Sequence, residues 1–323
     1  MAAIRIPAGV TIRAAVAARR ARLAVALPAA VLLVASAGST ACDSGARYPV
    51  QVAYTPPGPY ATTTGTVTAA AGTVIYDLFY PASYPSLGFK SPIVTWGNGT
   101  GGTPAQVSTL LRHLASYGFT VIASTLANAG SGREIAAAAR YLVAQDSAAG
   151  SVFRHHLDVH EVAAVGVSQG AGGAVRAATG NPALITTVLT FSLPNTFWVR
   201  PNPDCPTRAD CMPDPAALTQ PVFFLSTHGI FDAIIASPAT ERSYYHSTTV
   251  HAALGIVLYS DGKRADHNSI ANTASGGNPG GELGYATAWL EYQLRGDATA
   301  AGAFTGTRPE LVSNTNWPGS ATK

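Results

Sequence analysis

The chain has 323 residues, of which 47% are hydrophobic and only 11% are charged. This composition excludes an intrinsically disordered protein, because disorder requires low hydrophobicity and high net charge. Residues 1–41 hold five of the 20 Lys and Arg residues and no Asp or Glu, so the remaining 15 cations stand against 17 anions. A nucleic-acid-binding protein needs a basic patch to neutralise phosphates, and the rest of the chain has no such excess. The function therefore depends on a specific site.

Residues 1–41 have the pattern of an export signal. Arginines precede the apolar segment Leu23–Gly38, which ends in small residues and is shorter than the roughly 20 residues of a bilayer span. Ala35-Ser36-Ala37 fits cleavage by ordinary signal peptidase, whereas residues 39–42 (STAC) resemble a bacterial lipoprotein box with lipidation on Cys42. Both alternatives remain open, so we expect a protein that is extracellular, either freely secreted or anchored to the outer face of the cell membrane.

The three cysteines fit the same compartment. Cys205 and Cys211 lie six positions apart in a loop rich in Pro and Asp. In an oxidising compartment an even set of cysteines pairs, so these two residues are predicted to form a disulfide. Cys42 is then the odd cysteine, and lipidation would account for it. Three scattered cysteines make no ligand cluster, so no metal site is expected.

Strand and helix patterns alternate along the rest of the chain. Residues 42–70 are predicted to form a tether and a first edge segment, and residues 71–323 a single catalytic domain. Strands are predicted over residues 73–80, 91–96, 119–123, 162–167, 187–191, 222–225 and 255–259. Helices are predicted from Pro104 to Leu114, from a capping box at Ser131 and Glu134 to Val143, and over residues 169–178 and 285–295. This alternation predicts an α/β fold with a mostly parallel sheet covered by helices on both faces.

The pentapeptide Gly166-Val167-Ser168-Gln169-Gly170 carries the strongest functional signal. It matches the G-x-S-x-G motif and lies between an apolar strand and a predicted helix, where the motif requires it. The glycines allow a tight turn that exposes the Ser168 hydroxyl, and the helix that follows directs its N–H groups to the same place. The alternative is a glycine-rich turn that only packs a helix closely on a sheet.

At these residues the chain resembles the α/β-hydrolase family, and most closely its cutinase-like polyester hydrolases and chlorophyllase-like lipases. The similar segments are WGNGTGG at 96–102, LASYGFTVIAS at 114–124, GVSQGAGG at 166–173 and AWLEYQLRGD at 288–297. The resemblance implies a catalytic triad in the chain order Ser, Asp or Glu, His.

The resemblance also indicates the base and the acid. A serine hydroxyl needs a base, and the family places a histidine in the loop after the last strand, where His267 is the one histidine of residues 262–270. Asp232 is the first carboxylate after the strand 222–225 and is the predicted acid. Asp266 and Asp261 are its rivals.

Two backbone N–H groups are expected to form an oxyanion hole. One belongs to Gln169, the residue after the nucleophile. The resemblance assigns the other to the glycine-rich loop, where Asn98-Gly99 replaces the His-Gly pair of the family and makes Thr100 the expected donor. This loop lacks the lysine of a phosphate-binding P-loop, so a nucleotide site is not expected.

The loop between the strands 187–191 and 222–225 is short and rich in proline, so no large cap domain is predicted and the cleft is expected to be open. Trp96, Phe197 and Trp198 are predicted to line it, with ordinary core packing as the alternative. The sequence thus predicts a secreted or lipid-anchored serine hydrolase that cleaves small or polymeric carboxylic esters (esterase, lipase or cutinase-like) through a Ser168-His267-Asp232 triad and an acyl-enzyme. No cofactor is expected. The alternatives are a peptidase or amidase on the same fold, or a catalytically inactive surface lipoprotein that binds a ligand.

Overall fold

The computed structural model describes residues 12–14, 47–260, 262–272 and 281–323 of the chain. Most of the predicted export signal, Cys42 and Asp261 lie outside the described residues. Within those residues, no helix has both the length and the apolar character needed to cross a membrane.

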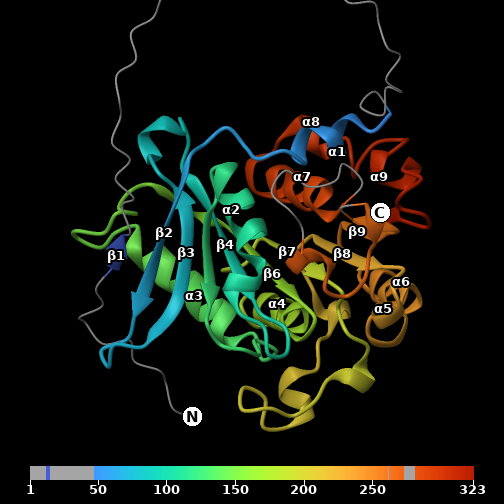
Figure 1. Ribbon diagram of the computed structural model, residues 1–323, viewed down its shortest axis with the longest axis horizontal. Coiled ribbons are helices and arrows are strands. Elements are labelled where there is room, and N and C mark those ends of the chain that lie inside the picture. The colour runs from blue at the N-terminus through green and yellow to red at the C-terminus, as the bar shows by residue number, and fades with distance from the viewer. Residues whose placement is uncertain (1–11, 15–46, 261, 273–280) are drawn as a thin grey trace, which may run out of the picture.

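One mixed sheet of ten strands forms the centre of the domain (Figure 1), in the order β1-β2-β3-β5-β4-β6-β7-β8-β9-β12. The strands of this sheet are β1 Ile12–Ala14, β2 Thr62–Thr68, β3 Val74–Pro81, β4 Ser91–Gly97, β5 Thr120–Ser124, β6 Leu157–Val167, β7 Thr187–Phe191, β8 Val222–Thr227, β9 Ala252–Val257 and β12 Ala321–Thr322. Neighbours from β5 through β4, β6, β7 and β8 to β9 are parallel, and the strands at both ends of the sheet are antiparallel. A separate ribbon pairs β10 Tyr259–Ser260 with β11 Lys263–Arg264.

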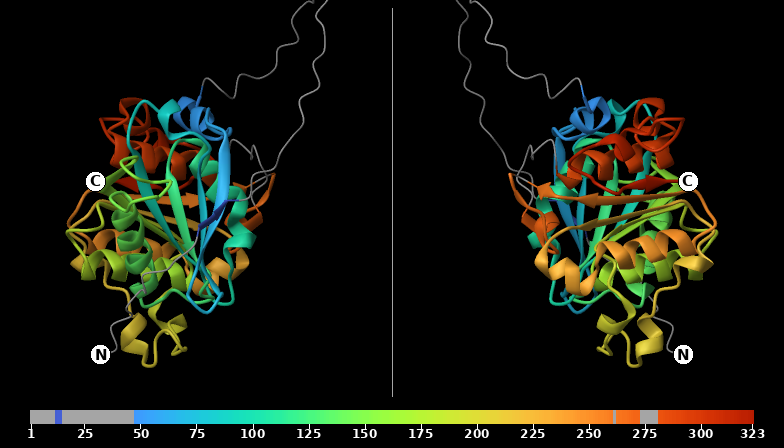
Figure 2. Two further views of the ribbon diagram at one scale, coloured as in Figure 1. Left: turned by 90° about the vertical axis from the view of Figure 1, so that its left-hand side faces the viewer. Right: turned by 90° about the vertical axis from the view of Figure 1, so that its right-hand side faces the viewer.

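Helices cover both faces of this sheet (Figure 2). The helices are α1 Pro49–Tyr54, α2 Ser108–Ser116, α3 Arg133–Gln145, α4 Gln169–Gly180, α5 Ile230–Ile235, α6 Pro238–Ser247, α7 Glu282–Arg295, α8 Ala298–Ala301 and α9 Glu310–Ser313. The core on one face joins α1, α2, α7 and α8 to the sheet, and the core on the other joins α3, α4 and α6. Successive side chains of a strand point to opposite faces, so Val94 packs in the first core and Ile93 in the second. The predicted α/β class with a mostly parallel sheet is confirmed.

The parallel register brings the carboxyl ends of four strands to one edge of the sheet. Gly97 of β4 lies opposite Gly166 of β6, Val167 lies opposite Phe191 of β7, and Phe191 lies opposite Leu225 of β8. Loops that leave adjacent parallel strands at this edge meet in a crevice, which is where open α/β sheets bind ligands.

Part of the segment 42–70, which was predicted to form a tether and a first edge segment, packs on the domain as a helix. Residues 49–54 form α1, and the side chains of Val50 and Tyr54 are buried in the core beside α7. The carboxylate of Glu310 accepts hydrogen bonds from the N–H groups of Val50 and Gln51, each at 2.8 Å. The domain therefore begins well before residue 71. The sequence concealed this because a six-residue helix shows too little of an apolar period.

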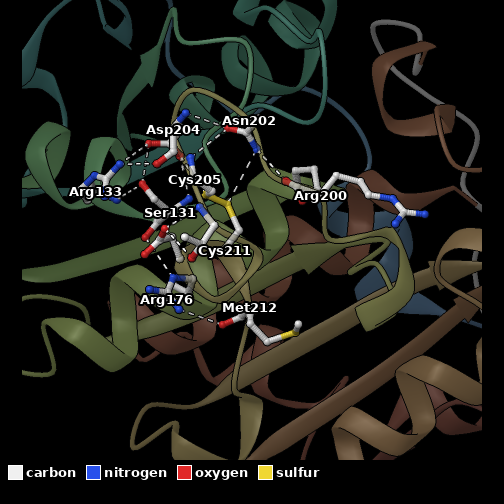
Figure 3. Close-up of a disulfide and its surroundings, with 12 residues drawn as sticks. Ser131, Arg133, Arg176, Arg200, Asn202, Asp204, Cys205, Cys211 and Met212 are labelled. Atoms are coloured by element: carbon white, nitrogen blue, oxygen red, sulfur yellow. Dashed lines mark hydrogen bonds and ion pairs between the residues drawn. A yellow bond between two sulfur atoms is a disulfide. The ribbon is translucent and has the colours of Figure 1, made fainter.

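The loop between β7 and β8 is a compact projection held by the predicted disulfide (Figure 3). Cys205 and Cys211 are joined, and the loop contains only the short 3-10 turns Thr196–Trp198, Arg208–Cys211 and Pro215–Ala217. No α-helical cap occurs among these residues. The carboxylate of Asp204 accepts hydrogen bonds from the N–H and the hydroxyl of Ser131, each at 2.7 Å. Ser131 therefore fastens this loop, and the predicted capping box is wrong, because the N-cap of α3 is Gly132.

Candidate active site

Ser168 occupies a strained turn between β6 and α4. Its backbone has φ 53° and ψ −123°, a conformation that non-glycine residues seldom adopt and that is typical of functional sites. The turn is held on both sides, because the Ser168 N–H donates to the carbonyl of Phe191 at 2.9 Å and the Ser168 carbonyl accepts from the N–H of Ala171 at 2.9 Å. The side chain is thus fixed at the carboxyl edge of the sheet.

Glycines make this turn sterically possible. A Cβ atom on Gly170 would lie 2.0 Å from the carbonyl oxygen of Gly97, and one on Gly166 would lie 2.2 Å from the carbonyl oxygen of Gly170. The first turn of α4 therefore packs directly against the backbones of β4 and β6. A Cβ on Gly99 would lie 3.0 Å from the Cβ of Ser168, which places the glycine-rich loop beside the Ser168 side chain.

Asp232 and His267 form a buried hydrogen-bonded pair. Nδ1 of His267 lies 2.7 Å from Oδ1 of Asp232, whose side chain is completely buried. Oδ2 of Asp232 accepts hydrogen bonds from Ser192 Oγ at 2.8 Å, Thr227 Oγ1 at 2.7 Å and the Thr227 N–H at 3.1 Å. These donors fix the carboxylate, which in turn fixes the imidazole with Nδ1 as donor and leaves Nε2 for a reacting group.

Asp266, the rival acid, has a different position. Its Oδ1 accepts hydrogen bonds from the N–H groups of His267 at 2.8 Å, Phe231 at 2.9 Å and Asp232 at 3.2 Å. Its carboxylate therefore joins the first turn of α5 to the loop that carries His267. Gly229 is required beside it, because a Cβ there would lie 2.2 Å from Oδ1 of Asp266.

Ser168 and His267 open into one cavity of about 750 Å³, which Thr100 and Gln169 also line. The structure thus brings together the residues that the sequence singled out, although no hydrogen bond joins the Ser168 hydroxyl to His267 among the described contacts. In unliganded sites this bond often tightens only when substrate binds. The backbone N–H groups of Thr100 and Gln169 have no acceptor within the described parts of the chain, so both are free to bind an oxyanion.

Asn98 organises the loop that carries Thr100. Its Nδ2 donates to the carbonyls of Ser124 at 2.7 Å and Leu126 at 3.0 Å, and its Oδ1 accepts from Trp96 Nε1 at 2.9 Å. The side chain is buried, so these bonds satisfy it fully and hold the loop above β4 and β5. Asn98 is therefore a structural replacement for the histidine expected at this place.

The three aromatic residues predicted to line the cleft have different positions. Trp198 lines the cavity, and its carbonyl accepts a hydrogen bond from Gln169 Nε2 at 2.9 Å. Trp96 also belongs to the cavity lining, but its side chain is fully buried and packs with Phe191, so it combines the predicted position with core packing. Phe197 is 61% exposed and is not among the lining residues. The prediction for Phe197 is wrong because its 3-10 turn directs the ring outward.

Two partners of Asp232 were not foreseen from the sequence. Ser192 directly follows β7 with a positive φ of 50°, and Thr227 is the last residue of β8. The available signal was their position at the carboxyl ends of strands beside the nucleophile strand. His113, by contrast, is buried on α2 and contacts Thr287 and the carbonyl of Tyr54; burial lowers its pKa to about 4, so it is a neutral structural residue.

A known family matches this architecture. The model of the PET hydrolase-like family matches residues 38–198, about half of the chain. This range includes the glycine-rich loop and the motif around Ser168 and ends before Asp232 and His267. No curated protein is similar to the chain in sequence. Together with the mostly parallel sheet and its two helical layers, the match identifies the chain as a PET hydrolase-like member of the α/β-hydrolase family.

Proposed function

We propose that the chain is a serine ester hydrolase in which Ser168 is the nucleophile, His267 the general base and Asp232 the acid that orients it. The observation that carries this proposal is the 2.7 Å hydrogen bond between His267 Nδ1 and the buried Asp232, in a site whose cavity also contains Ser168. The PET hydrolase-like family match supports ester hydrolysis.

The reaction follows from the geometry. His267 Nε2 removes the hydroxyl proton of Ser168 as Oγ attacks the ester carbonyl carbon, and the N–H groups of Thr100 and Gln169 bind the negative oxygen that forms. Collapse of this intermediate breaks the ester C–O bond, and the imidazolium gives its proton to the leaving alcohol. Water, deprotonated by His267, then attacks the acyl carbon. The bond from this carbon to Ser168 Oγ breaks, the imidazolium returns its proton to Oγ, and the carboxylic acid leaves. Asp232 stabilises the imidazolium in both halves.

An exposed apolar rim favours bulky or polymeric esters as substrates. The rim consists of Phe197, Ile230, Phe231 and Ile234, whose side chains are 56% to 79% exposed. The turn that carries Phe197 is held against α5, because Trp198 Nε1 and Asn195 Nδ2 both donate to the carbonyl of Ile234. Exposed apolar clusters mark interaction surfaces, and this one adjoins the cavity through Trp198 and Ile235. A polyester is the substrate class that suits both the rim and the family match.

Export to an oxidising compartment completes the proposal. The Cys205–Cys211 disulfide is typical of exported proteins, and the arginine-rich, apolar segment before Gly38 provides the signal. Lipidation of Cys42 would keep the enzyme at the outer face of the membrane. Free secretion after cleavage at Ala37 is the alternative.

Labelling by a fluorophosphonate probe tests the catalytic assignment. Wild type and His160→Ala, which removes an exposed histidine near the start of β6 and outside the cavity lining, should be labelled, whereas Ser168→Ala and His267→Ala should not. An unlabelled but folded wild type would favour the inactive binding protein. Assays on matched p-nitrophenyl esters and p-nitroanilides then separate an esterase from an amidase. Cleavage of short esters without attack on polyester films would contradict the polymer substrate.

A further inference from the structure

The charge of the cavity is set by one residue. Among the described residues that line it, Arg200 is the only side chain with a permanent charge. The other polar lining side chains are the His267 imidazole and neutral amides or hydroxyls: Asn98, Thr100, Thr103, Gln106, Asn128, Ser168, Gln169, Asn202 and Asn268. No carboxylate belongs to this described lining, so the cavity favours a ligand with a negative group.

Arg200 lines the cavity, and its guanidinium has no acidic partner among the described residues. Its Cζ lies 4.6 Å from the ring centroid of Phe197 and 5.9 Å from that of Trp198, and stacking of this kind attracts a cation to the aromatic faces. The ion pairs of the described residues belong to Arg133, His267 and Arg295, and no hydrogen bond from the Arg200 side chain occurs within the same set. Its N–H groups are thus available to a ligand.

The backbone of Arg200 is fixed by the disulfide-bonded loop. Its carbonyl accepts a hydrogen bond from Asn202 Nδ2 at 3.3 Å, and the side-chain oxygen of Asn202 accepts from the N–H groups of Asp204 and Cys205. In Figure 3 the Arg200 side chain extends away from the disulfide. A cation that is stacked, unpaired and anchored at its backbone loses little freedom when it binds a carboxylate, for which the planar guanidinium offers two parallel N–H donors.

We propose that Arg200 is a specificity residue that selects esters bearing a free carboxylate remote from the scissile bond, that is, monoesters of dicarboxylic acids. This inference rests on the proposed ester hydrolase function and refines its substrate class. Hydrolysis of one ester bond in a polymer of a dicarboxylic acid leaves a fragment with a carboxylate at its new end. Arg200 then favours the fragments that earlier cuts produce, so the enzyme shortens chains from acidic ends.

The test compares two esters that differ only in charge. Mono(4-nitrophenyl) terephthalate carries the remote carboxylate, and 4-nitrophenyl 4-carbamoylbenzoate replaces it with a neutral amide of similar size. Wild type should prefer the carboxylate ester in kcat/KM by about 5- to 10-fold, mainly through KM, the scale of a partly exposed charged hydrogen bond. Arg200→Gln should abolish this preference and Arg200→Glu should reverse it. The rate on the amide ester, which offers Arg200 no carboxylate, is the reference for each variant, so the preference is a ratio measured within one protein.

The control is Arg208→Gln, which removes a charge from the same loop but outside the cavity lining and should keep the wild-type preference. The preference should also fall between 0.05 and 0.5 M NaCl, because salt screens exposed charges. An equal preference in wild type and Arg200→Gln would overturn the role of Arg200. Absence of hydrolysis of both esters by wild type would instead overturn the proposed function, so the two failures are distinguishable.

Discussion

The contact between Gly170 and β4 makes a quantitative prediction. In Gly170→Ala the new Cβ would lie 2.0 Å from the oxygen and 2.4 Å from the carbon of the Gly97 carbonyl, and 2.7 Å from the Asn98 oxygen. All three atoms belong to backbone, so no side chain can rotate away. Since real Cβ contacts under 3.0 Å essentially never occur, the first turn of α4 must retreat by about 1 Å.

This displacement should be expressed in both rate and stability. The first residue of α4, Gln169, carries a proposed oxyanion donor, and a 1 Å error in such a position typically costs about 10²-fold in rate. Overpacking of a close contact costs about 1–3 kcal/mol in the free energy of unfolding. We therefore expect kcat on p-nitrophenyl butyrate to fall about 100-fold in Gly170→Ala, with a measurable loss of stability in urea unfolding.

Gly172→Ala is the matched control in the same helix. Its Cβ would find the Cys211 carbonyl oxygen and Pro213 Cγ at 3.8 Å, which is ordinary van der Waals contact. An alanine inside a helix stabilises the folded state by about 0.5–1 kcal/mol relative to glycine. This variant should therefore be slightly more stable than wild type and fully active. A Gly170→Ala variant with wild-type rate and stability, or equal losses in both variants, would refute the reasoning.

Three further predictions follow from other contacts. Asp266→Ala removes the acceptor of three N–H groups and should lower kcat about tenfold at similar KM, on the scale of one lost charged hydrogen bond, whereas Asp266→Asn keeps an acceptor oxygen and should recover most of the rate. Glu241 on α6 is completely buried, and burial raises its pKa well above the usual 4.5. The folded state therefore keeps a proton that the unfolded chain loses above pH 4.5. The free energy of unfolding should fall as pH rises from there to the folded pKa, by up to about 1.4 kcal/mol per pH unit. Glu241→Gln should remove this pH dependence, as measured by chemical unfolding at pH 5 and pH 8. Replacing Cys205 and Cys211 by Ser opens a loop of sequence separation six and should cost about 2 kcal/mol, with faster hydrogen exchange over residues 196–217.

Each of these predictions has a contradicting outcome. Equal kcat in Asp266→Ala and wild type would show that the backbone around α5 is held without this carboxylate. An unchanged slope between pH 5 and pH 8 in Glu241→Gln would assign the pH dependence to other groups. Unaltered hydrogen exchange over residues 196–217 in the double Ser variant would mean that the bonds of Asp204 to Ser131 hold the loop without the disulfide.

Local patterns predicted the interior of the fold well. The strand predicted over residues 187–191 is β7 with the same bounds. The helix predicted over residues 169–178 is α4, which begins at the same residue and ends two residues later, at Gly180. The last central strand was predicted too late in the chain, at residues 255–259, whereas β9 spans Ala252–Val257. Its first two residues are alanines, which have a weak preference for strands. The helix α6 was missed because most of its residues are polar, and only Glu241 and Tyr245 are buried.

The candidate site was predictable where chain order and strand ends determine it. Ser168 follows from its motif, and the family resemblance indicates His267 and Asp232 by their places after two strands; a hydrogen bond joins these two side chains. Ser192, Thr227 and the bonds of Asp266 could not be predicted, because they depend on which side chains meet across distant loops. The outward ring of Phe197 is likewise decided by one 3-10 turn.

The short helix α5 combines two tasks on opposite sides. Asp232 points inward to the imidazole, while Ile230, Phe231 and Ile234 point to solvent beside the cavity. Adsorption to a solid surface through these residues would therefore load the same short helix that carries Asp232, the proposed acid of the triad. A substitution at Ile230, Phe231 or Ile234 that changes binding to a surface is therefore also expected to change kcat. Both properties should be measured for each such variant.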